Sequence, residues 1–508
     1  MKSKRGKSAG VAPRRAHGAV ILAGVILFAA LVFRMVSLTT FDTLFDEQIT
    51  RDVVTGIWHG EWSNNWKHTV SAKDYRNDQY NFSSYLYADG LIAGAAAQLD
   101  AFLSDGKPDF VFWSRLFSAV TGTLAIYLFY LVARRLFPPG TAIAAMSLMA
   151  VMPLLVQDSH YARPEAFVLA LTGAAYLLLL QFDSHRDRLR YLGCSAFCFG
   201  VLIACKVSLI PMAAIPLLFL ASQPDRRLLL RGAGMCVGCT LLGIFIGVPH
   251  AFFHPAAYWH GVEFLRHQYA EGRPPHAAAN GTSATLTALY FWQTTGLLLL
   301  FSLAGALVLA RRRQFLLLAA IGGPVAFYLA YFSLQRAFFE RNLSHVAPLM
   351  AILAAVALLA LCETLPLHVR TTALVALMAL TAAPAVWVSG KLVFIAMRAS
   401  SEQRALNYES SLMTTAGKIG GTMGLFTDAQ FNYAMQLAAS LGEDALLRVP
   451  DYHDAFTKKH LEELERRTNW HEVGYFPSVF EGFDVNTMIA YHSVSFRYLF
   501  VRADPPAP

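Results

Sequence analysis

Long apolar blocks recur along most of the chain, and they limit its possible folds more strongly than any other feature. A helix needs roughly 20 apolar residues to cross the hydrocarbon core of a bilayer, and many of these blocks approach or reach that length. Charged residues make up only 15% of the sequence and hydrophobic residues 55%, whereas a soluble domain carries about 25% charged residues. The sequence therefore predicts a polytopic integral membrane protein that is mainly α-helical.

Positive charge is concentrated in short segments between the apolar blocks, as it is in cytoplasmic loops. This placement accounts for the net charge of +8, so no nucleic acid partner is expected. A basic tail, residues 1–17, precedes an apolar run without a following signal-peptidase site, which predicts an uncleaved first helix with a cytoplasmic N-terminus. All six cysteines lie inside apolar segments, which disfavours a disulfide framework or a cysteine zinc site.

The apolar stretch 85–103 decides the path of the chain. If it crosses the membrane, the basic clusters at 134–135 and 226–231 lie outside, against the positive-inside rule. If it is an interfacial or re-entrant helix, about eleven spans follow. These form a transmembrane module over residues 18–397, with outer loops 41–109 and 250–283. Residues 398–508 then lie outside, and their Gly-rich turns and charged helical stretch predict a small α+β domain.

Acidic residues follow the first predicted helix directly. Asp46 and Glu47 form a pair near the membrane, and such a pair can serve as general base or as metal ligands. The alternative is a pair of solvated loop acids. Arg34 lies within the first helix and needs an anionic partner or water, unless it snorkels to the interface.

A second group of polar residues precedes a predicted helix that begins at Pro164. Arg163 suits phosphate because a guanidinium can form two parallel hydrogen bonds, and the helix start also favours an anion. His160 lies in the same turn. Glu165 adds a second acid and possible metal ligand, with complementing the helix dipole as the alternative. Lys206, at the outer end of a helix, is a phosphate ligand or a snorkelling lysine.

Two further groups lie in predicted outer segments. Arg336 and Arg341 oppose the positive-inside bias and so suggest an anionic ligand, with an ion pair to Glu340 as the alternative. His250 and His254 have the i, i+4 spacing that zinc accepts. Prolines interrupt that stretch and no HExxH motif accompanies it, so an interfacial loop or a loop that contacts the acceptor is the favoured interpretation.

Taken in order, these segments resemble the GT-C class of polyprenyl-phosphate-sugar glycosyltransferases. The resemblance is to the bacterial branch related to protein O-mannosyltransferases and the aminoarabinose transferase of lipid A. It covers roughly residues 20–350. It rests on the acidic pair at 46–47 and on the segments YNFSSYLY, WSRLFSAVTGTLAIYLFYLVARRLF, HYARPE, KVSLIP and FFERNLSHVAP. The implied fold is a GT-C-like helix bundle with juxtamembrane helices.

The resemblance implies an inverting, single-displacement transfer of a monosaccharide. Asp46 would be the base on the acceptor hydroxyl, and Glu47 would orient Asp46 or the acceptor. The lipid phosphate would be held by a set of cations: Arg163, Lys206 and either Arg336 or Arg341. Where the family turn more often has aspartate, this chain has Glu165.

The resemblance also implies the partners and the location. The donor would be a polyprenyl-phosphate sugar, and the acceptor a glycan, a lipid or a protein. The protein would lie in the cell inner membrane, with the site and the C-terminal domain in the periplasm. Relatives differ in their need for a divalent ion, so no cofactor is certain and Mg²⁺ or Mn²⁺ stays open. The alternative function is a transporter or flippase of lipid-linked saccharides, which predicts mid-membrane charges and symmetric halves.

Overall fold

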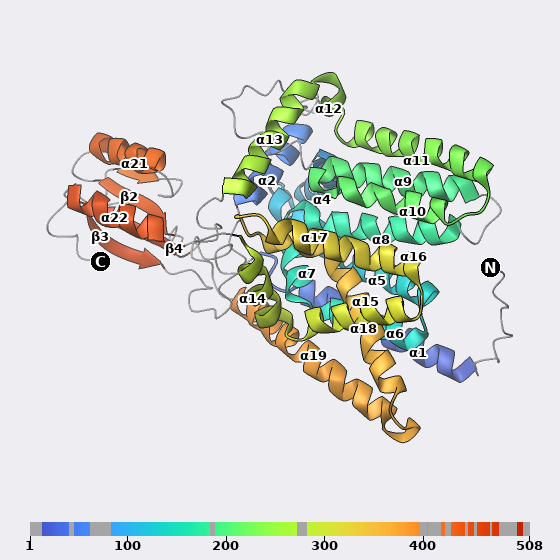
Figure 1. Cartoon of the computed structure of the whole chain (residues 1–508). Helices are drawn as coiled ribbons and strands as arrows, with labels where there is room; N and C mark the ends of the chain where they lie inside the picture. Colours follow the sequence, from blue (N-terminus) through green and yellow to red (C-terminus); the bar gives the residue numbers. More distant parts are fainter. Residues whose placement is uncertain are drawn as a thin grey trace.

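The computed structural model describes most of the helical part of the chain and the core of its C-terminal region. The described residues are 13–39, 45–60, 83–182, 188–271, 282–396, 404, 418–421, 428–441, 445–451, 455–467, 470–476 and 495–500. Within them, helices run through the N-terminal four-fifths of the chain and a small mixed sheet follows (Figure 1). The predicted fold class, a mainly helical membrane bundle with a small C-terminal α+β domain, is confirmed.

The first half of the helical module contains α1 (Pro13–Met35), α2 (Phe45–Trp58), α4 (Ser83–Ser104), α5 (Phe110–Leu136), α6 (Pro139–Val151), α7 (Pro153–Asp158), α8 (Pro164–Phe182), α9 (Arg188–Cys205), the 3-10 helix η2 (Val207–Ala213) and α10 (Ala214–Ala221). The second half contains α11 (Arg226–Gly247), α12 (His250–Phe253), α13 (Pro255–Glu271), α14 (Ala284–Thr295), α15 (Leu298–Arg311), α16 (Phe315–Leu317), the π-helical turn η3 (Leu318–Gly322), α17 (Gly323–Ser333), the 3-10 helix η4 (Glu340–Val346), α18 (Ala347–Glu363) and α19 (Leu367–Ala396).

Eight helices in the described ranges are long and apolar enough to cross a membrane, or nine if the bent pair α14 and α15 is one span. Two further apolar helical segments, Pro139–Val151 and Val207–Ala221, are too short to be candidate spans, so the structure has fewer candidates than the eleven predicted. Pro153 separates α6 from α7, and Pro211 lies in the 3-10 segment before α10. Proline removes a backbone donor and breaks the regular helix, which explains the difference. The stretch 85–103 forms α4, which is not among the candidate spans.

Helix α18 lies in the centre of the bundle, and nearly all of its side chains are buried. It packs against α15, where Gly305 lets the backbones approach closely: a Cβ there would meet Leu353 O at 1.9 Å. Helices α9 and α11 are joined in the same way. A Cβ at Gly200 would lie 2.2 Å from Thr240 O, and one at Gly243 would lie 2.4 Å from Phe197 O. Small residues at such contacts are typical of helix packing in membranes.

The C-terminal domain has a four-stranded sheet in the order β1-β2-β4-β3. Strand β1 (Lys418–Gly421) is parallel to β2 (Ala445–Asp451), with α21 (Asp428–Leu441) as the crossover. Strand β4 (Ser495–Phe500) runs antiparallel to both β2 and β3 (His471–Phe476), and α22 (Ala455–Arg467) connects β2 to β3. The domain has its own apolar core, which includes Phe431, Leu447, Leu464 and Trp470.

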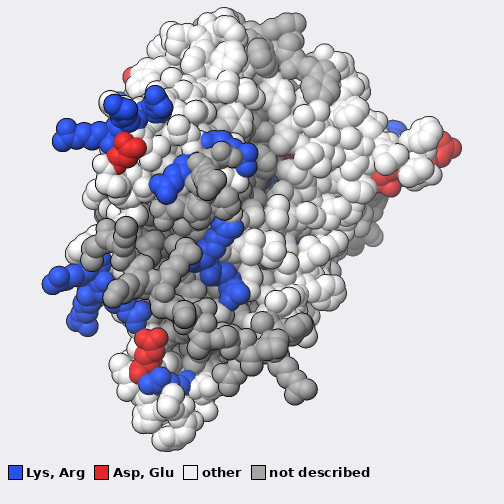
Figure 2. Space-filling view, turned by 90° about the vertical axis from the view of Figure 1, so that its right-hand side faces the viewer, with Lys and Arg blue, Asp and Glu red and all other residues white. Residues whose placement is uncertain are grey.

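The two ends of the helical module differ in charge. Exposed arginines occupy one end, at 134–135, 226–231 and 311–313, and Arg312 pairs there with Glu363 at 2.9 Å. The start of α11 and the short helix α16 point toward the right-hand side of Figure 1. Figure 2 views the molecule from that side and shows Lys and Arg side chains gathered there with few acids. Helix α18 runs from the opposite end to Glu363, so its start at Ala347 lies at the end away from these arginines.

Candidate functional site

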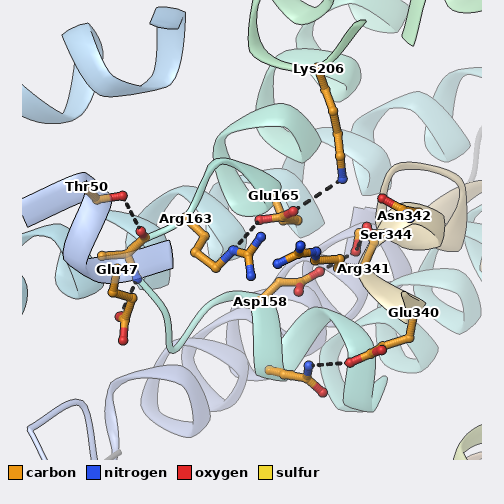
Figure 3. A network of polar contacts seen from close by, with 12 residues as sticks. Glu47, Thr50, Asp158, Arg163, Glu165, Lys206, Glu340, Arg341, Asn342 and Ser344 are labelled. Atoms are coloured by element: carbon orange, nitrogen blue, oxygen red, sulfur yellow. Dashed lines mark hydrogen bonds and ion pairs between the residues drawn. The ribbon is translucent and has the colours of Figure 1, made fainter. Parts of the chain in front are cut away.

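The turn between α7 and α8 carries Arg163, and α2 holds this turn from both sides. Thr50 Oγ1 donates to the carbonyl oxygen of Ala162 at 2.8 Å, and the Ala162 N–H donates to Glu47 Oε1 at 2.8 Å (Figure 3). Asp46 lies in the first turn of α2, directly before Glu47. The side chain of Asp46 lies outside the described part of the structure. Asp46 directly precedes Glu47, and Arg163 directly follows Ala162. The hydrogen bond between Glu47 and Ala162 therefore keeps the backbones at Asp46 and Arg163 near each other.

Glu47 is fully buried and binds groups of the chain itself. Arg115 Nε and Nη2 donate to its two carboxylate oxygens at 2.8 and 2.7 Å, and Arg115 Nη1 donates to the Leu38 carbonyl at 2.6 Å. A guanidinium that grips a carboxylate with two parallel bonds fixes its orientation. Glu47 was predicted to orient Asp46 or the acceptor. The structure shows it joining α2 to α5 and to the turn before Arg163.

Two cations converge on Glu165 in the first turn of α8. Arg163 Nε lies 3.4 Å from Glu165 Oε2, and Lys206 Nζ lies 3.3 Å from Glu165 Oε1 (Figure 3). Arg163 and Glu165 are buried, and the Lys206 side chain is 16% exposed. The cations thus come from two elements that meet at one carboxylate, in a place largely closed to water. Charges act strongly on one another in such surroundings.

The 3-10 helix η4 closes this cluster from another side. Ser344 Oγ is hydrogen-bonded to Asp158, and Gln157 Nε2 donates to Glu340 Oε1 at 3.0 Å. Arg341, in the first turn of η4, is drawn with this network in Figure 3. Its guanidinium also lies over the Phe339 ring, 5.0 Å from the centroid. Glu340 was offered as an ion-pair partner of Arg336 or Arg341, and the structure gives it Gln157.

Burial and the nearby Glu165 carboxylate raise the pKa of Asp158 well above its ordinary value. The geometry agrees with a protonated acid. Ser344 Oγ also lies 2.8 Å from the Arg341 carbonyl oxygen, and one hydroxyl proton serves only one acceptor. If Ser344 donates to that carbonyl, Asp158 is the donor in its own bond with Ser344. The site then carries fewer negative charges than its count of carboxyl groups suggests.

Arg34 and His160 are buried and bonded to main-chain carbonyls. Arg34 Nη1 donates to Ala30 O at 3.1 Å and to Ala150 O at 3.0 Å, so this arginine covers the C-terminal end of α6. It neither meets an anion in the described contacts nor snorkels to an interface. His160 Nδ1 and Nε2 lie 2.7 and 3.0 Å from the carbonyl oxygens of Val156 and Val36. Burial lowers the pKa of His160 to about 4, and the ring joins α1 to α7.

The remaining predicted residues are placed as follows. Arg336 is exposed, and its backbone N–H donates to Tyr269 O at 2.9 Å, which ties the loop before η4 to α13. None of its described contacts brings its guanidinium to Glu165. His250 begins the short helix α12, and its side chain lies outside the described residues. Over the described part of the chain, no group of three or more His, Cys, Asp or Glu side chains could hold a metal ion.

Several members of this network were missed in the sequence, among them Arg115, Asp158 and Ser344. Each lies within or beside an apolar segment that was assigned to a span or a motif as a whole. A charged side chain inside such a segment is itself a signal, because an isolated charge there is expensive. Arg115 in WSRLF carried that signal. Its partner is 68 positions away in the sequence, which no local pattern reveals.

The family model for dolichyl-phosphate-mannose-protein mannosyltransferases matches residues 109–253, less than a third of the chain. That range includes Arg115, Asp158, Arg163, Glu165 and Lys206. No curated protein sequence matches the chain.

Solved structures match over more of the chain. ArnT from Cupriavidus metallidurans bound to undecaprenyl phosphate has a TM-score of 0.51 and 16% identity, over 94% of this chain and 75% of ArnT. Apo ArnT gives 0.51 and 14%, over 95% and 98%. The oligosaccharyltransferase AglB from Archaeoglobus fulgidus, with an inhibitory peptide and a dolichol-phosphate, gives 0.51 and 14%, over 75% of this chain and 56% of AglB.

These identities are low, so the solved structures establish the fold alone, and the family model covers only part of the chain. The chain spans little more than half the length of AglB. It spans most or nearly all of ArnT. The chain therefore has the fold of the GT-C glycosyltransferases, as its resemblance to the branch of protein O-mannosyltransferases and ArnT indicated.

Proposed function

We propose that this protein is a glycosyltransferase that moves a monosaccharide from a polyprenyl-phosphate donor to a hydroxyl group of a glycan, a lipid or a protein. One observation carries the proposal: Arg163 and Lys206 converge at a largely buried point, where Glu165 is their shared partner. A phosphodiester is an anion of the kind that such a pair binds. The ArnT and AglB structures hold undecaprenyl phosphate and a dolichol-phosphate, which supports this donor class.

The reaction is a single displacement with inversion. The acceptor oxygen bonds to the anomeric carbon as the bond from that carbon to the phosphate oxygen breaks. The polyprenyl phosphate leaves as a monoester with more negative charge than the donor. Preorganised cations in a dry site stabilise that developing charge. Arg163 and Lys206 supply this stabilisation, with Arg341 as the third cation.

Asp46 removes the proton from the acceptor hydroxyl in this proposal. The hydrogen bonds of Glu47 and Thr50 to Ala162 hold the start of α2 against the turn that carries Arg163. A base on α2 is therefore held near the phosphate cations. Glu47 is a positioning residue here, because Arg115 and Ala162 already occupy its carboxylate.

The site faces the non-cytoplasmic side in this proposal. Arginine clusters favour the cytoplasmic side of a membrane, and the cluster of Arg163, Glu165 and Lys206 lies at the end of the bundle opposite to the arginines at 311–313. The location is then the cell inner membrane, with the site and the C-terminal domain in the periplasm.

The test of the reaction compares two acids on α2. Purified protein is incubated with a labelled undecaprenyl-phosphate sugar and membrane glycan, lipid and protein acceptors. Asp46→Asn should lower the transfer rate by about 10²–10⁴-fold, the range for loss of a general base. Asp52→Asn is the matched control, because Asp52 lies on the same helix with an exposed side chain paired to Arg51. Equal activity of the two variants would remove Asp46 as the base.

The phosphate cations have a separate signature. Lys206→Met should raise the KM for the donor by about 10–100-fold, the equivalent of one charge-assisted hydrogen bond. The KM for the acceptor should stay near that of the wild type. Treatment with EDTA, followed by Mg²⁺ or Mn²⁺, measures any need for a divalent cation in the same assay.

The alternative function is a transporter or flippase of lipid-linked saccharides. It predicts that lipid-linked sugar changes leaflet in proteoliposomes without cleavage of the sugar–phosphate bond. The described charges in the Arg163–Lys206 cluster gather at one end of the bundle, which favours transfer over transport. Movement of intact donor with no transferred product would reverse that preference.

A further inference from the structure

The part of the site formed by α7 and η4 contains hydrogen-bonding atoms that the protein leaves unused. Gln157, Glu340 and His345 are at most 2% exposed. Gln157 Nε2 donates to Glu340, but Gln157 Oε1 and His345 Nε2 have no partner in the described structure. Leaving a buried polar group unsatisfied costs about 1–3 kcal/mol. Such groups are rare in folded proteins, and each of them requires an explanation.

The residues that carry these atoms adjoin members of the phosphate cluster in the sequence. Gln157 directly precedes Asp158, and Glu340 directly precedes Arg341. The charges of Arg163 and Glu165 act on the Glu340 carboxyl, and the charge of Lys206 acts on His345. Figure 3 places Glu340 on the side of Asp158 that is away from Lys206. The residues with unused atoms therefore border the phosphate cluster.

The orientation of these groups is fixed before any ligand arrives. The His345 ring packs edge-on against Tyr328, with the ring centroids 4.2 Å apart. The bond from Gln157 Nε2 to Glu340 sets the amide so that its oxygen remains available. Preorganised donors and acceptors recognise a ligand at a low entropic cost.

We propose that Gln157, Glu340 and His345 bind the hydroxyl groups of the donor sugar and set the sugar specificity of the enzyme. This inference rests on the proposed function. The sugar is the part of the donor that is bonded directly to the phosphate, so side chains next to the phosphate cations face it. The polyprenyl chain is a hydrocarbon and has no hydrogen-bonding group to pair with these polar atoms. An acceptor attacks the anomeric carbon from the face opposite to the phosphate.

A carboxylate and an amide oxygen accept hydrogen bonds from sugar hydroxyls, and an imidazole nitrogen donates or accepts one. A site built to bind a hydroxyl rejects the analogue that lacks it, because its own buried groups are then left unpaired. The protein should thus distinguish a sugar from its deoxy analogue at the position that Glu340 contacts.

The experiment separates sugar binding from phosphate binding. Full-length protein is assayed with undecaprenyl-phosphate mannose, undecaprenyl-phosphate glucose and the monodeoxy analogues of both. Sugar-free undecaprenyl phosphate serves as a competitive inhibitor. The test variants are Glu340→Gln and Gln157→Met, which keep the side-chain size. The control is Tyr176→Phe, which removes a buried bond to the Ala320 carbonyl elsewhere in the bundle.

Glu340→Gln should lower discrimination between the preferred sugar and one deoxy analogue by about tenfold or more, since hydrogen bonds to charged groups are the stronger ones. The inhibition constant of sugar-free undecaprenyl phosphate should stay within about twofold of wild type. Gln157→Met should act in the same direction. Tyr176→Phe should change neither quantity. Neither the discrimination between sugars nor the inhibition constant depends on the concentration of active enzyme. Partial loss of folded protein therefore does not produce the expected result.

Three outcomes oppose the proposals. If wild type transfers sugar and both test variants keep its discrimination, the unused atoms hold only structural water and the inference fails alone. The same holds if the variants weaken sugar-free undecaprenyl phosphate as much as the donors. If wild type transfers no sugar from any of these donors and binds them no better than the sugar-free lipid, the proposed function and the inference fail together.

Discussion

The Glu47 carboxylate connects three segments through three hydrogen bonds. It receives two bonds from Arg115 on α5 and one from Ala162 in the turn before α8. Both side chains of the ion pair are buried. A buried pair adds little net stability compared with an apolar pair, but the loss of one partner leaves the other as an unpaired buried charge. The pair therefore specifies where α2 sits.

Glu47→Gln should destabilise the protein by about 3–5 kcal/mol, because Arg115 keeps its charge without a counter-ion. The glutamine still accepts a hydrogen bond from Ala162, so the loss reports the charge. Thermal unfolding in detergent measures it. The double variant Glu47→Gln with Arg115→Met should be more stable than Glu47→Gln alone. Additive losses in this double-mutant cycle would show that the two residues act independently.

His160 makes stability depend on pH. Burial lowers its pKa to about 4 in the folded protein, whereas an unfolded histidine titrates near 6.5. Between these values the unfolded chain binds the proton and the folded chain does not, so stability falls as the pH falls from about 6.5 toward 4. The contribution is roughly 3 kcal/mol, present in full above the unfolded pKa.

His160→Gln should flatten this part of the stability profile relative to the wild type. Thermal unfolding between pH 4.5 and pH 7.5 measures the slopes, and other titrating groups cancel in the comparison. A wild-type slope that survives the substitution would assign the pH dependence to another group.

Some residues of the candidate site were predicted from the sequence, and the residues that they pair with were missed. Arg163, Glu165 and Lys206 were chosen from residue type and helix position, and the structure brings them together. Arg115 and Asp158 were missed because their roles come from pairing with distant residues. Arg34 and His160 were offered as site candidates, yet main-chain carbonyls bind them. Bonds to main-chain carbonyls cannot be predicted from residue types, because every residue carries such a carbonyl.

Helices α9 and α11 pack closely because glycines lie at their contact. Gly200 and Gly243 lie where the two backbones nearly touch, and a Cβ on either would collide with a carbonyl oxygen of the other helix. Backbone atoms cannot rotate away as a flexible side chain does. Small residues at such a crossing allow the close approach on which helix association in membranes depends.

Gly200→Ala and Gly243→Ala should each destabilise the bundle by about 1–3 kcal/mol, the usual cost of overpacking. Gly238→Ala is the matched control, since Gly238 is also on α11 and a Cβ there meets nothing within 4 Å. The control should be neutral or slightly stabilising, as alanine favours helix over glycine. Thermal unfolding compares the three variants, and equal behaviour of all three would contradict the close contact.

Element boundaries were predicted less well than element existence. Hydropathy located nearly every long helix, because a span needs a minimum apolar length. It did not reveal that the segments around Pro153 and Pro211 form shorter helices. The helix over 85–103 was predicted, and α4 extends over it from Ser83 to Ser104. The C-terminal domain was recognised as α+β, but its strand order depends on pairings between distant segments.

In the whole molecule, the exposed arginine clusters and the Arg163–Lys206 cluster lie at opposite ends of the helical bundle. The exposed arginines at 311–313 lie at the end of α15, where Arg312 meets Glu363 at the end of α18. The other end of α18 follows η4, whose Ser344 bonds to Asp158. A helix of that length separates the two ends, so the basic face in Figure 2 is remote from the Arg163–Lys206 cluster. This separation yields a test of the membrane orientation.

Ser104→Cys and Ala270→Cys, each in a cysteine-free background, should react with a membrane-impermeant maleimide in intact cells. Arg312→Cys should react only after the membrane is permeabilised. Ser104 and Ala270 are exposed and lie at the ends of α4 and α13, while Arg312 is in the basic cluster. The physical reason is that arginine clusters stay on the cytoplasmic side. If Ser104 and Ala270 react from opposite sides, α4 crosses the membrane. If Arg312 reacts in intact cells, the proposed orientation is inverted, and the phosphate cations then face the cytoplasm.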